Sequence, residues 1–258
     1  MILEYKDIPI FYTNQGEGGA VVLLHGFLET SSMWKHLIPE IESQHNIIAI
    51  DLLGHGQTGC LGYIHTMELM AEAVAFVLDY LKVEKFFIIG HSMGGYVALA
   101  LAESFPQRIK GLCLLNSTPF ADSPERQSNR DRAIKAVKYN PQSFITMAIA
   151  NLFGPEKVSQ FAEEIELIKL EAMSLSLQGI IAALEGMKIR KDRSHVLEQL
   201  DAHKMVLLGR NDPVLEYVIL KSKFDALGID SVDFEGGHMT YIENIREFTY
   251  KLKRFIEK

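Results

Sequence analysis

The sequence predicts an α/β fold: a mainly parallel sheet of the eight-stranded type with helices on both faces, and a helical cap inserted into the chain. Three observations lead to this class. Short apolar runs alternate with helical stretches through the first 116 residues, the alternation stops after Asn116, and it resumes at Met205. Strands of a parallel sheet are buried on both faces, so they are typically short, continuous apolar runs connected by helices.

The first part of the chain supplies most of the expected strands. Residues 2–13 are expected to form a hairpin that turns near Asp7. Apolar periodicity predicts helices at Ser31–Ser43 and Met67–Leu81 and a further helix directly after Ser92. Buried strands are expected at Ala20–Leu24, Asn46–Asp51, Lys85–Ile89 and Lys110–Leu115.

The second part begins with a long segment that contains no buried-strand run. From about Phe120 to Ser194 the pattern is mostly helical, with breaks expected at Gly154-Pro155 and at Gly179. We therefore expect a core of residues 1–119 and 195–258 and a cap of residues 120–194, with hinges near 118–119 and 192–193. The core is then expected to continue with a strand at Met205–Leu208, a helix near Val214–Leu227, a strand at Ser231–Phe234 and a closing helix at Tyr241–Ile256.

Composition limits the possible locations and partners. The chain has 258 residues, of which 48% are hydrophobic and 23% charged, as is ordinary for a globular protein. A net charge of −7 argues against nucleic-acid and anionic-membrane partners. Two cysteines form no disulfide framework, the N-terminal segment is broken by charges, and no run reaches the roughly 18 apolar residues of a membrane span. We expect a cytoplasmic monomer or homodimer whose partner is a small-molecule substrate.

Gly90-His91-Ser92-Met93-Gly94 fits the pattern G-x-S-x-G and carries the clearest chemical signal. An apolar strand precedes it and a helix follows it, which is the context that a nucleophile elbow requires. A strand that reverses directly into a helix brings two backbones close together, and glycines remove the Cβ atoms that would collide. The pattern therefore predicts that the hydroxyl of Ser92 is exposed at the tip of the turn.

Residues suited to activating that hydroxyl follow the ends of other strands. Asp212 comes after the strand at Met205–Leu208 and His238 after the strand at Ser231–Phe234, so both are expected at the same edge of the sheet. A histidine can take the proton of a serine, and a carboxylate can orient that histidine. The backbone N–H groups of Phe27 and Met93 are the candidates for an oxyanion hole.

These motifs together resemble the α/β-hydrolase family, and the resemblance covers nearly the whole chain. It rests on the segments LLHGF, DLLGHGQT, GHSMGG, GRNDPV and GGHMTYIE, and on gaps of 120 residues from Ser92 to Asp212 and 26 from Asp212 to His238. The resemblance implies that Ser92 is the nucleophile, Asp212 the acid and His238 the base. The chain departs from the family at Thr58, where serine is frequent, and at His203-Lys204, where a proline is common.

Competing assignments exist for two of these features. Some relatives place the acid after the strand that here ends at Leu115, which makes Asp122 an alternative to Asp212. Gly54-x-Gly56-x-x-Gly59 has the spacing of a dinucleotide fingerprint, but no helix opens directly after it to bind a phosphate. The histidines lack metal-ligand spacing. We therefore expect neither a cofactor nor a metal ion.

The sequence thus predicts a serine hydrolase that cleaves a small or medium carboxylic ester or lactone through an acyl-enzyme on Ser92. Carbon–carbon bond hydrolysis or a lyase reaction by the same triad is an alternative, and a non-hydrolytic ligand receptor is an alternative of another class. Apolar residues of the cap and the core are expected to line the substrate pocket, with the candidates Trp34, Phe120, Met147, Phe153, Met173 and Met239.

Overall fold

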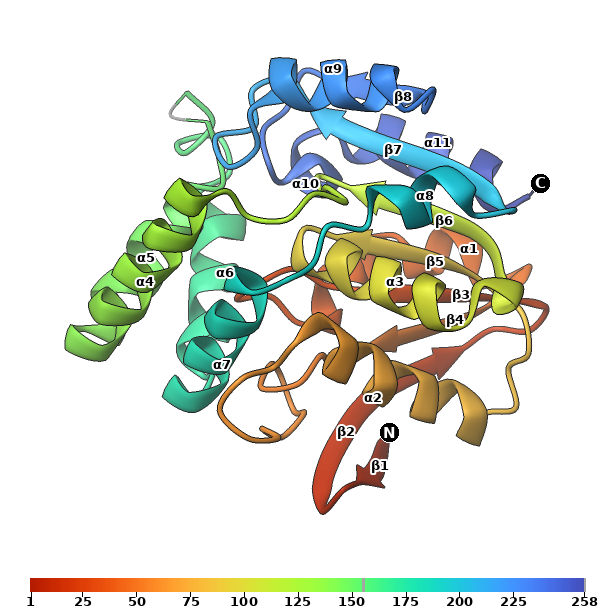
Figure 1. Cartoon of the computed structure of the whole chain (residues 1–258), viewed down its shortest axis with the longest axis horizontal. Coiled ribbons are helices and arrows are strands. Elements are labelled where there is room, and N and C mark those ends of the chain that lie inside the picture. Colours follow the sequence, from red (N-terminus) through yellow and green to blue (C-terminus); the bar gives the residue numbers. More distant parts are fainter. Residues whose placement is uncertain (155, 258) are drawn as a thin grey trace.

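The computed structural model describes residues 1–154 and 156–257, and these form one mixed sheet of eight strands between two layers of helices (Figure 1). The sheet order is β1-β2-β4-β3-β5-β6-β7-β8. From β4 to β8 every neighbouring pair is parallel, whereas β1–β2 and β2–β4 are antiparallel. The predicted fold class, with its mainly parallel sheet, is confirmed.

The strands lie where the apolar runs predicted them. They are β1 (Ile2–Tyr5), β2 (Ile8–Gln15), β3 (Gly19–Leu24), β4 (His45–Ile50), β5 (Phe86–His91), β6 (Ile109–Leu115), β7 (His203–Gly209) and β8 (Ser231–Phe234). The three central strands β3, β5 and β6 are almost entirely buried, because helices cover both of their faces. A strand in that position can use apolar residues at every position, which is why its sequence shows no alternation.

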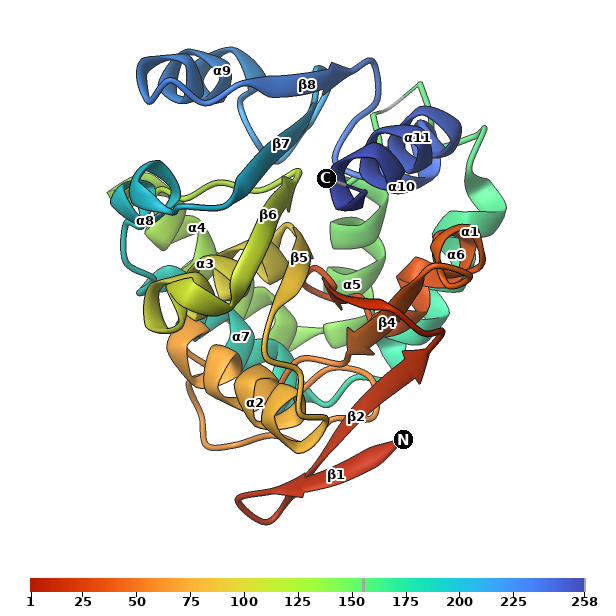
Figure 2. The ribbon, with the colours of Figure 1, turned by 90° about the vertical axis from the view of Figure 1, so that its right-hand side faces the viewer.

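Some helices cover the two faces of the sheet, and others lie beyond the carboxyl ends of its parallel strands. They are α1 (Ile38–Ile41), α2 (Met67–Tyr80), α3 (Met93–Ser104), α4 (Pro124–Tyr139), α5 (Pro141–Ala150), α6 (Ala162–Met173), α7 (Leu177–Lys188), α8 (Ser194–Gln199), α9 (Tyr217–Ala226), α10 (Thr240–Glu243) and α11 (Ile245–Ile256), with 3₁₀ turns at η1 (Ser31–His36) and η2 (Pro106–Arg108). Figures 1 and 2 show α2, α3, α8 and α9 on one face and α1 and α11 on the other.

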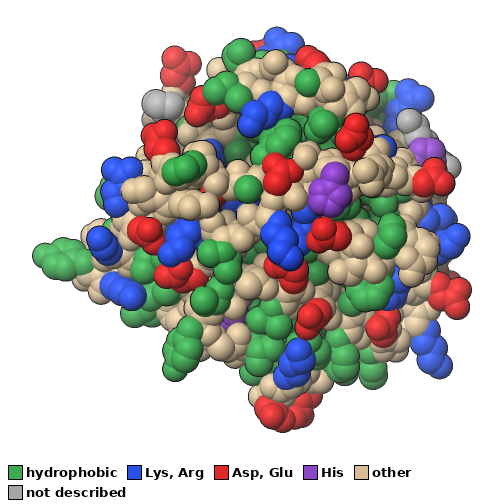
Figure 3. All heavy atoms as spheres, in the orientation of Figure 1, with side chains coloured by type: hydrophobic (Ala, Val, Ile, Leu, Met, Phe, Trp, Pro, Cys, Tyr) green, Lys and Arg blue, Asp and Glu red, His purple; other side chains and the backbone are tan. Residues whose placement is uncertain are grey.

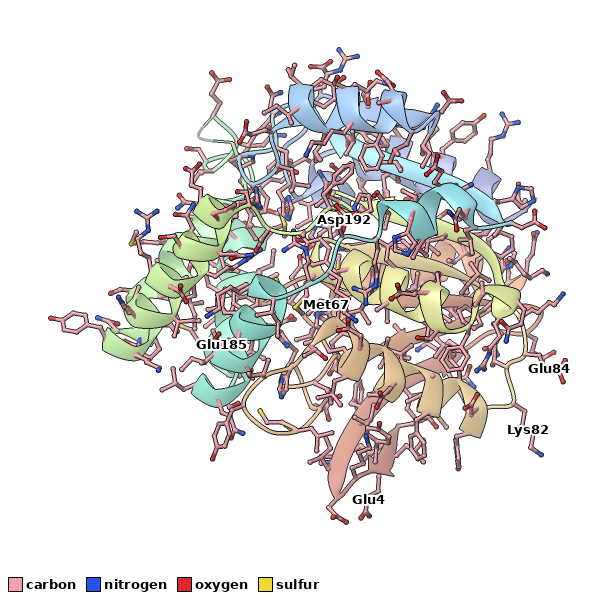
Figure 4. The ribbon with its side chains drawn as sticks, viewed as in Figure 1. Glu4, Met67, Lys82, Glu84, Glu185 and Asp192 are labelled. Atoms are coloured by element: carbon pink, nitrogen blue, oxygen red, sulfur yellow. The ribbon has the colours of Figure 1, made fainter. Side chains whose placement is uncertain are left out.

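Helices α4 to α7 lie together beyond the carboxyl ends of the parallel strands (Figure 1). The chain enters this segment after β6 and returns through residues near Asp192, which Figure 4 labels between α7 and α8. At its base the two connections touch, because the Arg193 N–H donates to the Pro119 carbonyl at 2.7 Å. The segment therefore begins and ends at one place on the core.

Three expectations about the helices differ from what the structure contains, two of them about the extent of a helix and one about a break. The helix predicted at Ser31–Ser43 is a 3₁₀ turn followed by the four-residue α1, and Pro39, which has no N–H to donate, lies in the first turn of α1. The closing helix is interrupted at Asn244, which separates α10 from α11.

The third difference concerns Gly179, which was expected to break a helix. It lies inside α7, where its N–H donates to the hydroxyl oxygen of the N-cap residue Ser176 at 3.0 Å. A Cβ at Gly179 would collide with the backbone of Gly54, so this glycine allows close packing of α7 on a core loop. The break expected at Gly154-Pro155 falls partly on Pro155, which lies outside the described residues.

None of the helices in the described ranges is by itself long and apolar enough to cross a membrane, although the bent pair α6 and α7 meets that test together by length and composition. On the face shown in Figure 3, acidic and basic side chains are interspersed and no large area carries a single sign of charge.

Candidate active site

Ser92 lies in a strained turn between β5 and α3. Its backbone has φ 48° and ψ −113°, a conformation that non-glycine residues rarely adopt. Glycines make the turn possible: a Cβ at Gly90 would collide with the backbone of Gly94, and a Cβ at Gly94 would collide with the backbone of Leu24. The side chain of Ser92 is left at the tip, half-buried, while its neighbours on both sides are buried.

The side chains of Ser92, His238 and Asp212 form one hydrogen-bonded chain. The Ser92 Oγ lies 2.9 Å from His238 Nε2, and His238 Nδ1 lies 2.8 Å from Asp212 Oδ2. His238 and Asp212 side chains are each 2% exposed. The three residues predicted from separate strand ends are therefore brought together, in the geometry that orients an imidazole between a hydroxyl and a carboxylate.

Asp212 is held in place by four donors. Its Oδ1 accepts from the N–H groups of Val214 and Leu215 at 2.8 and 2.9 Å, and its Oδ2 accepts from the Asn116 amide at 3.0 Å in addition to His238. Burial raises the pKa of the Asp212 carboxyl, but the charge of His238 and these hydrogen bonds outweigh it and hold the pKa below its usual value. The carboxyl is therefore ionised at neutral pH.

Asp122, the alternative acid, lies elsewhere. Its buried carboxylate pairs with Arg126, Arg130 and Arg190 at the base of the helical segment. The residue that the sequence reasoning missed is Asn116 at the end of β6, where relatives can carry the acid: its amide donates both to Asp212 and to the Gly237 carbonyl, at 3.0 Å each. Its position directly after a strand was the only signal in the sequence.

The two candidate oxyanion amides are available. Met93 is the first residue of α3, so its N–H has no partner within the helix and lies at the positive end of the helix dipole. Within the described residues the Phe27 N–H donates to no other group, and its neighbour Leu28 has φ 64°, which turns the backbone at this point. Met93 directly follows Ser92, and Phe27 follows β3, the strand that pairs with β5, so both amides lie near the Ser92 turn.

Comparison with known protein families agrees with this geometry. Residues 19–160 match the family model described as alpha/beta hydrolase fold, and this range is more than half of the chain. The chain belongs to the alpha/beta hydrolase family. The resemblance stated from the motifs is thereby confirmed.

Several known proteins and solved structures are similar to this chain. A thermophilic esterase from Thermogutta terrifontis superposes with a TM-score of 0.88 and 29% identity over 97% of this chain and 93% of that one. An enol-lactonase from Burkholderia xenovorans superposes with a TM-score of 0.91 over the whole of both chains, at 20% identity, which shows the fold alone. The acetyltransferase component of an acetoin-cleaving system from Pseudomonas putida is 28% identical over 94% of this chain but only 65% of its own length. The chain thus spans under two thirds of the length of the curated relatives that match it first. Together the family and its esterase and lactonase neighbours support a hydrolase.

None of the six candidate pocket residues lines either of the two cavities described below. Trp34 and Met239 are fully buried, and Phe153 is buried against the ring of Phe161 at 5.9 Å between centroids. Phe120 is half-buried 6.2 Å from the ring of Phe224.

The two candidate methionines of the helical segment are both exposed. Met147 is 64% exposed, because α5 buries the side that carries Ile145 and Ile149 and Met147 lies between them on the opposite side. Met173 is 42% exposed at the end of α6. Sequence shows that such residues are apolar, but the side of the helix that faces the core depends on tertiary packing.

Residues of η1 and α6 line two cavities of about 730 and 280 Å³, and neither cavity is lined by Ser92. The smaller one is lined by both apolar and polar side chains, from η1, α6 and α10–α11, and includes Glu29 and Tyr241.

The glycine loop at residues 54–59 holds a carboxylate of the chain itself. Asp51 Oδ2 accepts from the Gln57 N–H at 2.9 Å, Asp51 Oδ1 accepts from the Ser31 N–H at 2.8 Å, and a Cβ at Gly56 would collide with this carboxylate. The loop amides that would cradle a phosphate are thus partly engaged by Asp51. Among the residues that the structure describes, no group of three or more His, Cys, Asp or Glu side chains could hold a metal ion.

Proposed function

We propose that this chain is a serine hydrolase that cleaves a small or medium carboxylic ester or lactone through an acyl-enzyme on Ser92. The observation that carries the proposal is the hydrogen-bonded chain from Ser92 Oγ through His238 to Asp212, with distances of 2.9 and 2.8 Å. A receptor would not need a strained serine in hydrogen-bond contact with an imidazole that a buried carboxylate orients.

The first half-reaction follows from this arrangement. His238 Nε2 takes the proton of Ser92 as Oγ forms a bond to the carbonyl carbon, and the carbonyl oxygen becomes an oxyanion. The N–H groups of Met93 and Phe27 donate to that oxyanion. When the intermediate collapses, the carbon–oxygen bond to the alcohol breaks and the alcohol oxygen takes the proton from His238, which leaves an ester on Ser92.

The second half-reaction regenerates the serine. His238 takes a proton from a water molecule, whose oxygen attacks the acyl carbon, and then returns the proton to Ser92 Oγ as the acid leaves. Asp212 keeps Nδ1–H directed toward itself and stabilises the imidazolium that forms in both halves. In a lactone the alcohol and the acid belong to one molecule, so the same steps open the ring.

Similarity to known proteins favours ester and lactone substrates. The Thermogutta terrifontis esterase is similar in sequence as well as in fold, and the enol-lactonase shares the fold over its whole length. Fold alone does not set the reaction, because the same scaffold hosts several chemistries. The choice between ester, lactone and carbon–carbon bond is therefore made by experiment.

The test combines active-site labelling with a substrate panel. We expect a fluorophosphonate to label Ser92 in the wild type and Ser104→Ala proteins but not in Ser92→Ala; Ser104 lies at the far end of α3, where its hydroxyl donates to a helix carbonyl. We expect turnover of short-chain esters or lactones, but not of vinylogous diketones. Turnover of the diketones alone would favour the carbon–carbon hydrolase, and labelling without any turnover would contradict a hydrolase.

We further propose that residues 120–194 act as a cap that sets substrate choice. The His238 N–H donates to the Leu152 carbonyl at 3.2 Å, so the segment after α5 touches the loop that carries the base. Phe153→Ala should change the ranking of ester substrates, whereas Met147→Ala, at a solvent-exposed site on α5, should leave it unchanged. Equal rankings in both variants, with labelling of Ser92 lost in Phe153→Ala, would mean that the segment is core structure.

A further inference from the structure

A buried ion pair lies directly behind the candidate active site. His91, at the end of β5, and Glu29, in the turn after β3, are 1% and 3% exposed, and His91 Nδ1 lies 2.7 Å from Glu29 Oε2. Neither residue belongs to the Ser92–His238–Asp212 chain. In the sequence, His91 is distinguished only by its position before Ser92, and Glu29 belongs to none of the motifs.

The partners of Glu29 all donate hydrogen bonds. Glu29 Oε2 accepts from the Gly26 N–H at 2.7 Å, and Glu29 Oε1 accepts from the Tyr241 hydroxyl at 2.9 Å. With His91 these make three donors around one carboxyl group, which favours its ionised form. Burial raises the pKa of Glu29, but the charge and hydrogen bond of His91 outweigh it and leave the pKa lowered.

The partners of His91 both accept hydrogen bonds. Its Nδ1 faces the Glu29 carboxylate, and its Nε2 lies 3.0 Å from the His238 carbonyl oxygen, which can only accept. A neutral imidazole carries one N–H and can satisfy only one of these two, so the doubly protonated imidazolium fits the site. Burial lowers the pKa of His91, yet the charge of Glu29, its hydrogen bond and the His238 carbonyl outweigh it and leave the pKa raised.

We propose that His91 and Glu29 form a permanently charged pair that positions the oxyanion loop and the base loop around Ser92. The proposal rests on the proposed function, because it assigns positioning residues to that same reaction. His91 donates to the backbone of His238, and Glu29 accepts from the N–H of Gly26, the residue before Phe27. His91 itself precedes Ser92, so one ion pair joins the three backbone segments that carry the base, an oxyanion amide and the nucleophile.

Gly26 makes room for this pair. A Cβ at Gly26 would collide with Glu29 Oε2 and approach His91 Nδ1 to 2.7 Å. The Gly26 N–H can therefore reach the carboxylate directly. A buried ion pair costs desolvation and is weak evidence for stability, so its value here lies in fixed geometry. Displacements of about 1 Å at a reacting group can cost about 100-fold in rate.

The charge of His91 also acts on the base. The rings of His91 and His238 are 5.1 Å apart between centroids, so a change of charge at His91 acts on the imidazole of His238. The other titratable groups that face His91 are Glu29 from the turn after β3, Tyr241 from α10 and Asp212 from the loop after β7, with the buried His25 nearby. Replacing His91 by glutamine removes the positive charge and leaves the negative charge of Glu29.

The direct test is the protonation state of His91 in the wild-type protein. In a ¹⁵N-histidine spectrum assigned through the backbone, we expect both ring nitrogens of His91 to carry protons from pH 6 to pH 8. In Glu29→Gln, which keeps the shape and removes the charge, we expect a neutral His91 at pH 8. A neutral His91 in the wild type at pH 7 would overturn the proposal, and this readout does not depend on any substrate.

Kinetics test the positioning role. On an ester that the wild type hydrolyses, His91→Gln and Glu29→Gln should each lower kcat by about 10- to 100-fold with KM nearly unchanged, because substrate contacts remain. The acidic limb of the pH–rate profile of His91→Gln should move to higher pH. Glu72→Gln, the same change at an exposed pair with Lys6, should match the wild type.

The outcomes separate this proposal from the proposed function. If the wild type neither labels at Ser92 nor turns over esters, the proposed function fails while the spectrum of His91 still decides its charge. If the wild type is active and folded His91→Gln has unchanged kcat and an unmoved acidic limb, the pair is only structural and the proposal is wrong.

Discussion

Asp212 and Asp122 show how the surroundings of a carboxylate decide its role. Both are buried and both have a lowered pKa, but the causes differ. For Asp122, burial raises the pKa and the charges of Arg130 and Arg190 outweigh it, so this carboxylate is fully engaged by arginines. Asp212 keeps one oxygen directed at His238. Only Asp212 can therefore orient the base.

Asp212→Asn tests that role at the scale of one residue. An asparagine can occupy the same space, but its amide can donate to His238 Nδ1 and stabilise the wrong tautomer. In the Ser-His-Asp triad of serine proteases this change lowers kcat by about 10⁴-fold, and we expect a loss of that order here. Asp233→Asn, a change on β8 where the carboxylate pairs with Tyr217, is the control. Similar kcat values for the two variants would contradict the assignment of Asp212.

Among the elements, the helical segment is held to the core by a compact set of charges. Asp122 Oδ1 lies 2.6 Å from Arg190 Nη1, and the guanidinium of Arg190 stacks on Tyr96 of α3 at 4.1 Å from the ring centroid. Arg193 reaches Glu103 and Glu68 at 2.9 and 2.7 Å. Both connections of the segment are therefore fixed to the helices that cover the sheet.

Asp122→Asn tests this attachment. Removing one partner from a buried ion pair leaves Arg190 uncompensated, which typically lowers the free energy of unfolding by about 3–5 kcal/mol. Urea denaturation should show a loss of this order, and protease cleavage within residues 124–188 should become faster. Asp131→Asn is the matched control, because Asp131 pairs with Lys188 at the surface and such pairs contribute about 1 kcal/mol or less. Equal losses in the two variants would disprove the attachment.

The elements also show what local sequence can predict. The strands and the Ser92 turn were predictable because continuous apolar runs and the glycines of the turn act over a few neighbouring residues. Asp212 and His238 were predictable because strand ends of a parallel sheet share one edge. The Glu29–His91 pair was not, since its members are 62 residues apart and neither has a motif of its own. The buried side of α5 was not predictable either, because tertiary contacts decide it, and Met147 is exposed although it is apolar.

At the scale of the whole molecule, buried neutral histidines make stability depend on pH. Burial lowers the pKa of His55 to about 3 and that of His65 to about 4, although hydrogen bonds to the Leu53 carbonyl oppose this. In the unfolded chain both groups titrate near their ordinary value of about 6.5. The stability that they contribute is therefore present above that pH and is lost as the pH falls toward their folded values.

Denaturation at several pH values checks this expectation. At pH 5 each of the two histidines should lower the free energy of unfolding by about 2 kcal/mol relative to neutral pH. The loss between pH 7.5 and pH 5 should be smaller in His55→Asn than in the wild type. It should be unchanged in His36→Gln, where the side chain is exposed. The same pH dependence in all three proteins would show that buried histidines do not cause it.

The most direct measurement of the central claim is the mass of the protein during turnover of an ester. Rapid acid quenching followed by peptide mass analysis should find the acyl group of the substrate on the peptide that contains Ser92. The adduct should also form in Ser104→Ala and should be absent from Ser92→Ala. Turnover by Ser92→Ala should fall to the small residual rate that the oxyanion amides support. Near-normal turnover by folded Ser92→Ala would contradict an acyl-enzyme on Ser92.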